Sequence, residues 1–129
     1  MSDEALERNK QTAMAFYALA FNEGRPREAV ERYVGDDYIQ HNPHVASGKQ
    51  GFIDYFETLA RDYPVKQVNF IRTIAEGDLV VVHTHQTWEG FDDYASMDIF
   101  RFDAAGRIVE HWDVLQTVPK EMAHENSMF

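Results

Sequence analysis

The stretch Tyr94–Gln116, YASMDIFRFDAAGRIVEHWDVLQ, predicts two antiparallel β-strands joined by a tight turn. Apolar and polar residues alternate over Tyr94–Phe102 and again over Arg107–Gln116, a pattern typical of strands. The Asp-Ala-Ala-Gly segment between them has the composition of a hairpin turn. This hairpin is the starting point for predicting the fold and the site, because its strands carry both apolar and ionisable side chains.

The register of this hairpin decides which residues face Asp98. Side chains two apart share a face of a strand, so His111 and Asp113 lie on one face. A tight turn without a bulge places His111 opposite Asp98. A bulge at Gly106 shifts the pairing by one residue and places Trp112 there instead. The sequence leaves both registers open.

Two more strands are predicted immediately upstream, over residues 68–75 and Leu79–Trp88, with a Glu-Gly-Asp turn between them. His83 and His85 continue a series of alternate residues that begins with Leu79 and looks like a core face. We therefore expect both histidines to point inward, toward the aspartates of the following hairpin.

The first half of the chain predicts three amphipathic helices, with apolar stripes over residues 6–21, 29–34 and 52–63. A short extended piece, Tyr38–Asn42, lies between the second and third. We expect one α+β domain over residues 1–129, with the helices packed on the concave face of a strongly bent antiparallel sheet. Such a fold encloses a conical pocket that is open at one end.

Composition narrows the possible functions. The 129 residues are 44% hydrophobic and 26% charged, an ordinary globular balance, and the net charge is −10. An acidic chain without a basic run repels nucleic acid and anionic membranes, so neither is an expected partner. The absence of cysteine excludes a disulfide scaffold, a thiolate zinc site and a cysteine nucleophile.

The first residues, MSDEALERNK, are acidic and polar, the reverse of a signal peptide. No apolar run approaches the roughly 18 residues that a membrane helix needs. We therefore expect a cytoplasmic protein.

Polar residues in the predicted core suggest a site. Burying even a neutral polar group without a partner costs about 2–7 kcal/mol, so a carboxylate flanked by apolar residues needs partners or a ligand. Asp98 and Asp113 are two such residues, and we expect both to face the pocket. His41 and Asn42, which precede Pro43, are either pocket residues or an ordinary turn.

Known motifs are lacking: the sequence has no glycine-rich phosphate loop, no GxSxG elbow and no HExxH zinc helix. His83 and His85 offer two metal ligands, with a third from His111, Asp98 or His41. The His-x-His spacing alone is weak evidence, so we expect no metal and no cofactor.

Together these features resemble the SnoaL-like polyketide cyclase family, within the nuclear-transport-factor-2-like superfold, a cystatin-like roll. The resemblance covers nearly the whole chain, and its sharpest pieces are YIQHNP at 38–43, VHTH at 82–85, DIFRF at 98–102 and GRIVEHWDVLQ at 106–116. The last piece is similar to a bacterial branch described as predicted SnoaL-like aldol-condensation enzymes.

The resemblance implies acid–base chemistry without a cofactor, with an aspartate as the key base. Asp113 and Asp98 are similar to that aspartate. Ketosteroid isomerase, a distant member of the superfold, stabilises an oxyanion with a tyrosine and a protonated aspartate, and Tyr17 and Asp98 match them in chain order. The isomerase base corresponds to Asn42, which cannot accept a proton at neutral pH.

We therefore expect an enzyme that abstracts a proton α to a carbonyl of a small compound, leading to aldol, cyclisation, isomerisation or dehydration chemistry. The base is Asp113, His83 or His85, and a protonated Asp98 with Tyr17 stabilises the enolate. The remaining pocket residues are expected to bind the ligand: Tyr38, His41, Asn42, Trp88, Phe100, His111 and Trp112. The alternatives are a non-catalytic protein that binds a small ligand and a pure association module.

Two further expectations concern the outer surface. Ile71, Met97 and Ile99 are apolar on the face opposite the pocket, which predicts a homodimer through that face. The tail, Thr117–Phe129, ends in Met-Phe, so we expect it to be ordered and to pack on the domain or the dimer partner near the pocket mouth.

Overall fold

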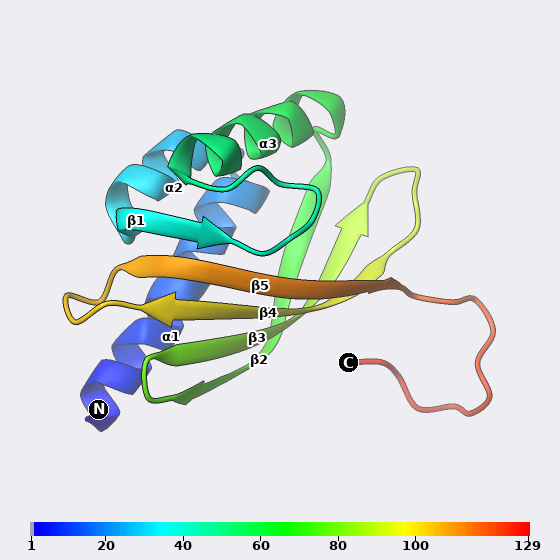
Figure 1. The fold of residues 1–129 in the computed structure, drawn as a ribbon. Coiled ribbons are helices and arrows are strands. Elements are labelled where there is room, and N and C mark those ends of the chain that lie inside the picture. The colour runs from blue at the N-terminus through cyan, green and yellow to red at the C-terminus, as the bar shows by residue number, and fades with distance from the viewer. Residues whose placement is uncertain (1) are drawn as a thin grey trace.

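The computed structural model describes residues 2–129 and has helices in the first half and most strands in the second (Figure 1). The helical elements are α1 (Asp3–Tyr17), a π-helical turn η1 (Ala18–Asn22), α2 (Pro26–Tyr33) and α3 (Lys49–Asp62). The strands are β1 (Val34–Gln40), β2 (Lys66–Glu76), β3 (Leu79–Trp88), β4 (Tyr94–Phe102) and β5 (Ile108–Thr117). The predicted α+β class is confirmed.

The sheet is mixed, so the prediction of a purely antiparallel sheet is wrong. Its strand order is β1-β5-β4-β3-β2, with β1 parallel to β5 and all other pairs antiparallel. Gly35 makes the added strand possible, because a Cβ there would lie 2.9 Å from Val109 Cγ1. Arg107 holds its start by donating from Nη2 and Nε to the Val34 carbonyl, at 2.8 and 3.0 Å.

The β4–β5 hairpin adopts neither predicted register: Asp98 lies opposite Asp113. Gly106, with φ of 80°, forms the turn, and Phe102 pairs with Ile108. A second irregularity follows between Arg101 and Phe102 and shifts the pairing once more. Each one-residue shift would move the side chains of β5 to the other face, so two shifts restore the original face. Asp98 and Asp113 therefore still lie on the same side of the hairpin.

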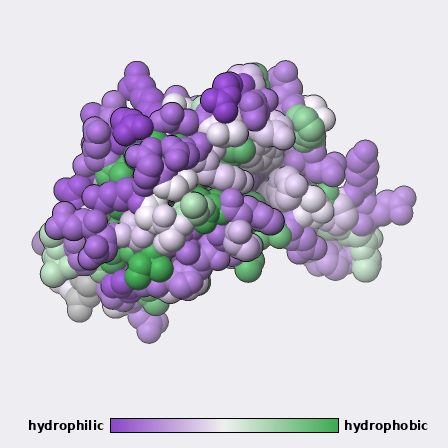
Figure 2. All heavy atoms as spheres, turned by 45° about the horizontal axis from the view of Figure 1, so that its top comes forward, coloured by the Kyte–Doolittle hydropathy of each residue, from purple (hydrophilic) through white to green (hydrophobic). Residues whose placement is uncertain are grey.

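The apolar core lies between the helices and one face of the sheet. α1 packs on β2 and β3, while α3 lies near β1 (Figure 1). Aromatic rings join the layers: the Phe16 ring lies 4.9 Å from that of Phe52 on α3 and 6.0 Å from that of Phe100 on β4. The surface in Figure 2 is mostly hydrophilic, with apolar residues in small scattered patches.

α1 changes its winding directly after Tyr17. The wider turn η1 follows without a break and carries Phe21, so Tyr17 and Phe21 both point toward the sheet. Short π-helical segments within α-helices occur often at functional sites. Among residues 2–129, no helix combines the length and the apolar character needed to cross a membrane.

The tail leaves β5 and returns toward the sheet without regular structure (Figure 1). The Phe129 ring stacks on His85, with centroids 4.0 Å apart and planes 9° apart, and lies 5.8 Å from the His83 ring. The end of the tail thus lies on the outer face of the sheet rather than near the cavity.

Candidate functional site

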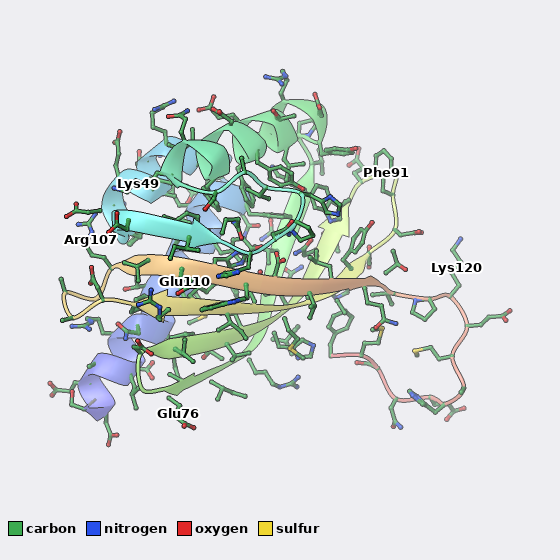
Figure 3. The ribbon with its side chains drawn as sticks, in the orientation of Figure 1. Lys49, Glu76, Phe91, Arg107, Glu110 and Lys120 are labelled. Atoms are coloured by element: carbon green, nitrogen blue, oxygen red, sulfur yellow. The ribbon has the colours of Figure 1, made fainter. Side chains whose placement is uncertain are left out.

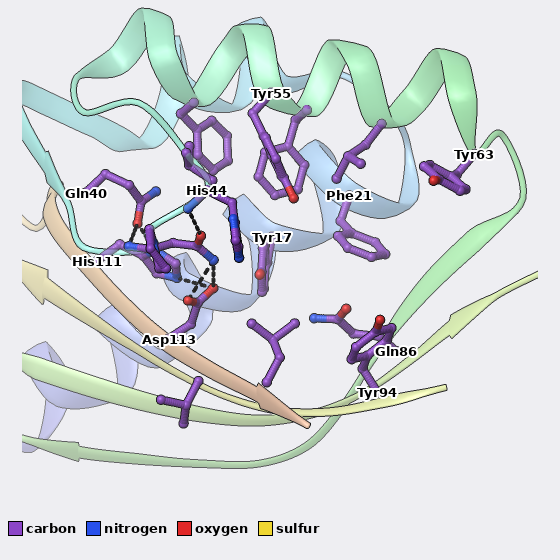
Figure 4. A pocket seen from close by; sticks show the side chains of 18 of the residues that line it. Tyr17, Phe21, Gln40, His44, Tyr55, Tyr63, Gln86, Tyr94, His111 and Asp113 are labelled. Carbon is purple, nitrogen blue, oxygen red and sulfur yellow. Dashed lines mark hydrogen bonds and ion pairs between the residues drawn. The ribbon is translucent and has the colours of Figure 1, made fainter. Parts of the chain in front are cut away.

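A cavity of about 670 Å³ opens between α1, η1 and α3 and the inner face of the sheet. Its walls are mainly aromatic and include Phe21, Phe52, Tyr55, Phe56 and Tyr63 (Figure 4). The loop between β3 and β4 borders one end, where Phe91 is 65% exposed (Figure 3). An apolar cavity of this size suits a small organic ligand.

His111 is held by hydrogen bonds at both ring nitrogens. Its Nε2 lies 2.9 Å from Asp98 Oδ1, and its Nδ1 lies 2.7 Å from Gln40 Oε1. Asp98 is 0% exposed and also accepts hydrogen bonds from the hydroxyls of Tyr17, at 3.2 Å, and Ser96, at 2.9 Å. Asp98 thus lies behind the cavity wall, whereas His111 and Tyr17 line it.

Gln40 fixes the protonation pattern of His111. Its Oε1 accepts from the backbone N–H groups of His41, at 3.1 Å, and Asn42, at 3.0 Å, so this atom is an acceptor. The Nδ1 of His111 must therefore carry a hydrogen. One proton then lies between His111 Nε2 and Asp98 Oδ1, on the imidazole or on the carboxyl.

Asp113 lies beside this pair and lines the cavity. Asn42 Nδ2 donates to both of its oxygens, at 2.8 and 3.0 Å, and Asn42 Oδ1 accepts from the backbone N–H of His44 at 2.8 Å (Figure 4). Burial raises the pKa of Asp113 and the Asp98 carboxyl adds to the effect, while His111 and the hydrogen bond from Asn42 lower this pKa. A carboxyl with a raised pKa in a cavity is typical of acid–base sites.

Tyrosine hydroxyls near these carboxyls remain protonated. Burial, reinforced by Asp98 and Asp113, raises the pKa of Tyr17 well above its ordinary value. Burial also raises the pKa of Tyr55, with a further contribution from Asp113. The Tyr17 hydroxyl already donates its hydrogen to Asp98, whereas the Tyr55 hydroxyl can donate a hydrogen bond inside the cavity, and Figure 4 shows it reaching there.

A model of the SnoaL-like domain matches residues 13–111. The chain belongs to the SnoaL-like family. A search of curated protein sequences finds no match. This assignment confirms the resemblance drawn from the strand and turn motifs.

Solved structures share the SnoaL-like fold. One from Bacillus cereus, provisionally named a polyketide cyclase, is 19% identical, with a TM-score of 0.76, and the match covers 89% of this chain and 78% of that one. Another provisional polyketide cyclase, from Acidithiobacillus ferrooxidans, is 22% identical, with a TM-score of 0.73 and coverage of 89% and 91%. A protein from Streptomyces galilaeus, provisionally named a hydroxylase, is 17% identical, with a TM-score of 0.70 and coverage of 86% and 90%.

In this SnoaL-like chain, the prediction that His83 and His85 face the cavity is wrong. His83 pairs with Met97, the neighbour of Asp98, so the histidines lie on the opposite face of the sheet. There Arg72 approaches His83 Nδ1, and His85 Nε2 lies 2.8 Å from Asp93 Oδ2. The prediction failed because the LVVV run at the start of β3 is apolar on both faces, so hydropathy did not show which face is the inner one.

His41 and Trp112 also lie outside the cavity. Their rings stack at 4.7 Å, and His41 Nε2 is 2.7 Å from Glu110 Oε2. Trp112 pairs with Ile99 on the outer face, because the two one-residue shifts from the tight-turn register leave each side chain on its original face. Tyr38 is buried behind the cavity wall, where its hydroxyl accepts from Gln40 Nε2 at 3.1 Å.

The other predicted residues reach the cavity. Those that line it are Tyr17, Asn42, Trp88, Phe100, His111 and Asp113. Asp98 joins them through His111 and Tyr17 without lining the cavity itself. Sequence reasoning missed Gln40, Tyr55 and Gln86, because a single Gln or Tyr in an amphipathic element carries no motif.

Asp98, His111 and Asp113 each offer one ligand atom within 4.8 Å of the others, which is close enough to hold a cation. Their own hydrogen bonds already satisfy them: Asp98 is hydrogen-bonded to Tyr17, Ser96 and His111, and Asn42 donates to both oxygens of Asp113. An ion would have to displace the proton between His111 and Asp98.

Proposed function

We propose that this protein is a cofactor-independent enzyme that removes a proton from the carbon α to a carbonyl group of a small, largely apolar substrate. The observation that carries the proposal is Asp113, a carboxyl that lines an aromatic cavity and whose pKa burial raises. A general base is most effective when its pKa lies near the working pH, and a water-poor cavity strengthens its interactions.

In the proposed reaction, a carboxylate oxygen of Asp113 takes the α-proton. The C–H electron pair moves into the new C=C bond, and the carbonyl oxygen becomes an enolate. The hydroxyl of Tyr55 donates a hydrogen bond to that oxygen, where the charge develops. The enolate carbon is then protonated or attacks a second carbonyl, so isomerisation, aldol addition and cyclisation share this first step.

Asp98 acts as a positioning residue in this scheme rather than as the predicted donor to the enolate. It has no exposed surface and holds the ring of His111, whose Nε2 lies 3.9 Å from Asp113 Oδ2. His111 lowers the pKa of Asp113, opposing burial. His111, held in place by Asp98, thus helps to keep the base available for proton abstraction.

The names of the structural relatives support a reaction of this class. The two provisional polyketide cyclases carry names for chemistry that joins carbon to a carbonyl. Since the hydroxylase name occurs on the same fold, the fold alone does not choose the reaction. The argument for proton abstraction therefore rests on the geometry of Asp113 and its neighbours.

The test follows deuterium exchange at the α-carbon of 1-tetralone in D₂O by proton NMR. The unaltered protein is expected to accelerate exchange, and Asp113→Asn to slow it by about 10²–10⁴-fold. Tyr55→Phe is expected to slow it less. Asp62→Asn, an exposed change on α3, is the matched control and is expected to have no effect.

A protein that binds 1-tetralone without accelerating exchange would contradict the proposal. It would favour the non-catalytic ligand-binding alternative on the same fold. Equal exchange by the unaltered protein and Asp113→Asn would exclude Asp113 as the base.

We further propose that two copies of the chain associate through the outer face of the sheet. Apolar side chains lie exposed there, with Ile74 at 60%, Met97 at 45% and Val114 at 70%. Helices cover the other face, so these residues have no cover of their own apart from the end of the tail. A second copy supplies an apolar surface of matching chemistry.

A further inference from the structure

Gln86 is a buried polar residue at the end of the cavity remote from Asp113. It lies on β3, is 1% exposed, and its carboxamide reaches toward the cavity in Figure 4. Its Oε1 has no hydrogen-bond partner among residues 2–129. Trp88 follows on the same face, and its indole Nε1 is also buried without a partner in that part of the chain.

The unpartnered polar groups of Gln86 and Trp88, two residues apart in an aromatic wall, need a physical explanation. Burying a hydrogen-bonding group without a partner destabilises a fold, and methionine or leucine would fill the same space without that cost. The polar groups near Asp113 are satisfied by one another, whereas Gln86 is not. A ligand atom that completes its hydrogen bonding supplies the reason.

The surroundings define the chemistry of that ligand atom. No Lys or Arg occurs among the described residues that line the cavity, and the chain carries a net charge of −10. Lys66, whose Nζ lies 5.5 Å from the centroid of the Phe21 ring, is near this end but does not line the cavity, so a carboxylate or phosphate would have no Lys or Arg of the described lining to pair with. A neutral hydroxyl group fits, because it can donate its hydrogen to the unpartnered Oε1 of Gln86, can accept from the indole N–H of Trp88, and needs no counter-charge.

The sheet register sets how far this group lies from the base. Gln86 pairs with Tyr94, which pairs with Thr117, four residues beyond Asp113 on β5. The Cα atoms of Gln86 and Asp113 are thus separated by about 13 Å along the strands and about 10 Å across them. Once both side chains reach inward, a ligand that contacts both must be longer than one ring.

We propose that Oε1 of Gln86, with the indole N–H of Trp88, forms a second polar subsite that binds a hydroxyl group at the end of the substrate remote from the reacting carbonyl. The substrate is then a neutral, ring-based compound of two or more rings with oxygen at both ends. This subsite deepens the proposed function and rests on it for the position of the reacting carbonyl.

The test compares 1-tetralone with 6-hydroxy-1-tetralone, which adds a hydroxyl across the ring system from the carbonyl. Calorimetry on the full chain is expected to show about tenfold tighter binding of the hydroxyl compound, since one buried hydrogen bond contributes on that scale. Gln86→Met keeps the side-chain length without the amide. It is expected to abolish the preference and to leave the affinity for 1-tetralone within about twofold.

Gln67→Met is the matched control, because Gln67 is exposed on β2 and away from the cavity. This variant is expected to keep the tenfold preference. Gln86→Met is also expected not to lower the melting temperature, since Oε1 of Gln86 has no partner to lose. A fall of several degrees would show that the carboxamide holds the scaffold together and would overturn the proposal.

The proposal is also overturned if the hydroxyl compound binds no tighter, fails to bind up to its solubility limit, or keeps its advantage in Gln86→Met. These affinities do not depend on turnover. Exchange without a hydroxyl preference therefore refutes the subsite alone. A preference that is lost in Gln86→Met, without any exchange, supports the subsite and refutes the proposed reaction.

Discussion

The substitution Asn42→Asp tests the contact on which the state of the base depends. In the folded chain, Asn42 Nδ2 donates to both oxygens of Asp113, at 2.8 and 3.0 Å. A carboxylate at position 42 would keep the bond from the His44 N–H through one oxygen and turn the other toward Asp113. Two carboxylates at this distance cannot both ionise without a large cost, so they share one proton.

The size of the effect follows from the distance. Two unit charges about 3 Å apart repel by about 5–6 kcal/mol at an effective dielectric constant of about 20. This repulsion corresponds to an increase of up to about 4 units in the pKa of the second carboxyl. The folded pKa then exceeds the unfolded value of about 3.9, so the stability that the shared proton provides is lost as pH rises through the folded pKa.

Urea unfolding at two pH values measures this loss. Relative to the unaltered protein, Asn42→Asp is expected to lose about 2–3 kcal/mol more stability near pH 8 than near pH 5.5. Asn42→Ala removes the same hydrogen bonds without adding a charge and is expected to show a much smaller dependence on pH. Equal losses for Asn42→Asp at both pH values would refute the contact between residue 42 and Asp113.

Four more outcomes are expected. The rate of α-proton exchange should rise with pH as Asp113 deprotonates, with a midpoint above the ordinary carboxyl pKa of 3.8. Asn42→Ala should raise that midpoint further, because the hydrogen bond from Asn42 lowers the pKa of Asp113. A midpoint at or below 3.8 contradicts the raised pKa. Asp98→Leu should lower the free energy of unfolding in urea by about 3–5 kcal/mol, because it leaves the buried partners of this carboxyl without a hydrogen bond. A loss below about 1 kcal/mol contradicts that network. Deleting residues 120–129 should lower the melting temperature by several degrees through loss of the terminal aromatic contact, whereas an unchanged melting temperature would show that the tail adds no stability. Light scattering should give twice the chain mass of 15.0 kDa and Met97→Lys should halve the result; a value of one chain mass for the unaltered protein disproves the dimer.

Much of the site could be predicted from alternation along two strands. Asp98, His111 and Asp113 share the inner face because side chains two apart on a strand share a side, and the structure keeps this parity. The link between Tyr17 and Asp98 followed from the order of elements in a related family, and a hydrogen bond of 3.2 Å joins them. The shared face of His111 and Asp113 did not depend on the hairpin register, but its coincidence with the face of Asp98 did, because a shift of one residue would have placed Trp112 opposite Asp98.

Other parts depend on tertiary contacts that no local pattern contains. The inner face of β3 carries Val80 and Val82, but the outer Leu79 and Val81 are equally apolar, so hydropathy could not place His83 and His85. The start of β1 at Val34 depends on pairing with a strand about 70 residues away. Gln40 lies within the YIQHNP piece, but neither its role nor that of Gln86 could be predicted, since both roles come only from the groups that surround them.

The paired irregularities of the β4–β5 hairpin limit how this protein can change in length. The turn at Gly106 and the bulge beside Phe102 each move the pairing by one position. Removing a single residue from residues 103–107 would turn His111 and Asp113 outward and bring Trp112 inside, unless the bulge disappeared in the same step. Evolution and loop grafting are therefore expected to alter the turn and the bulge together, so that insertions and deletions here survive as coupled pairs.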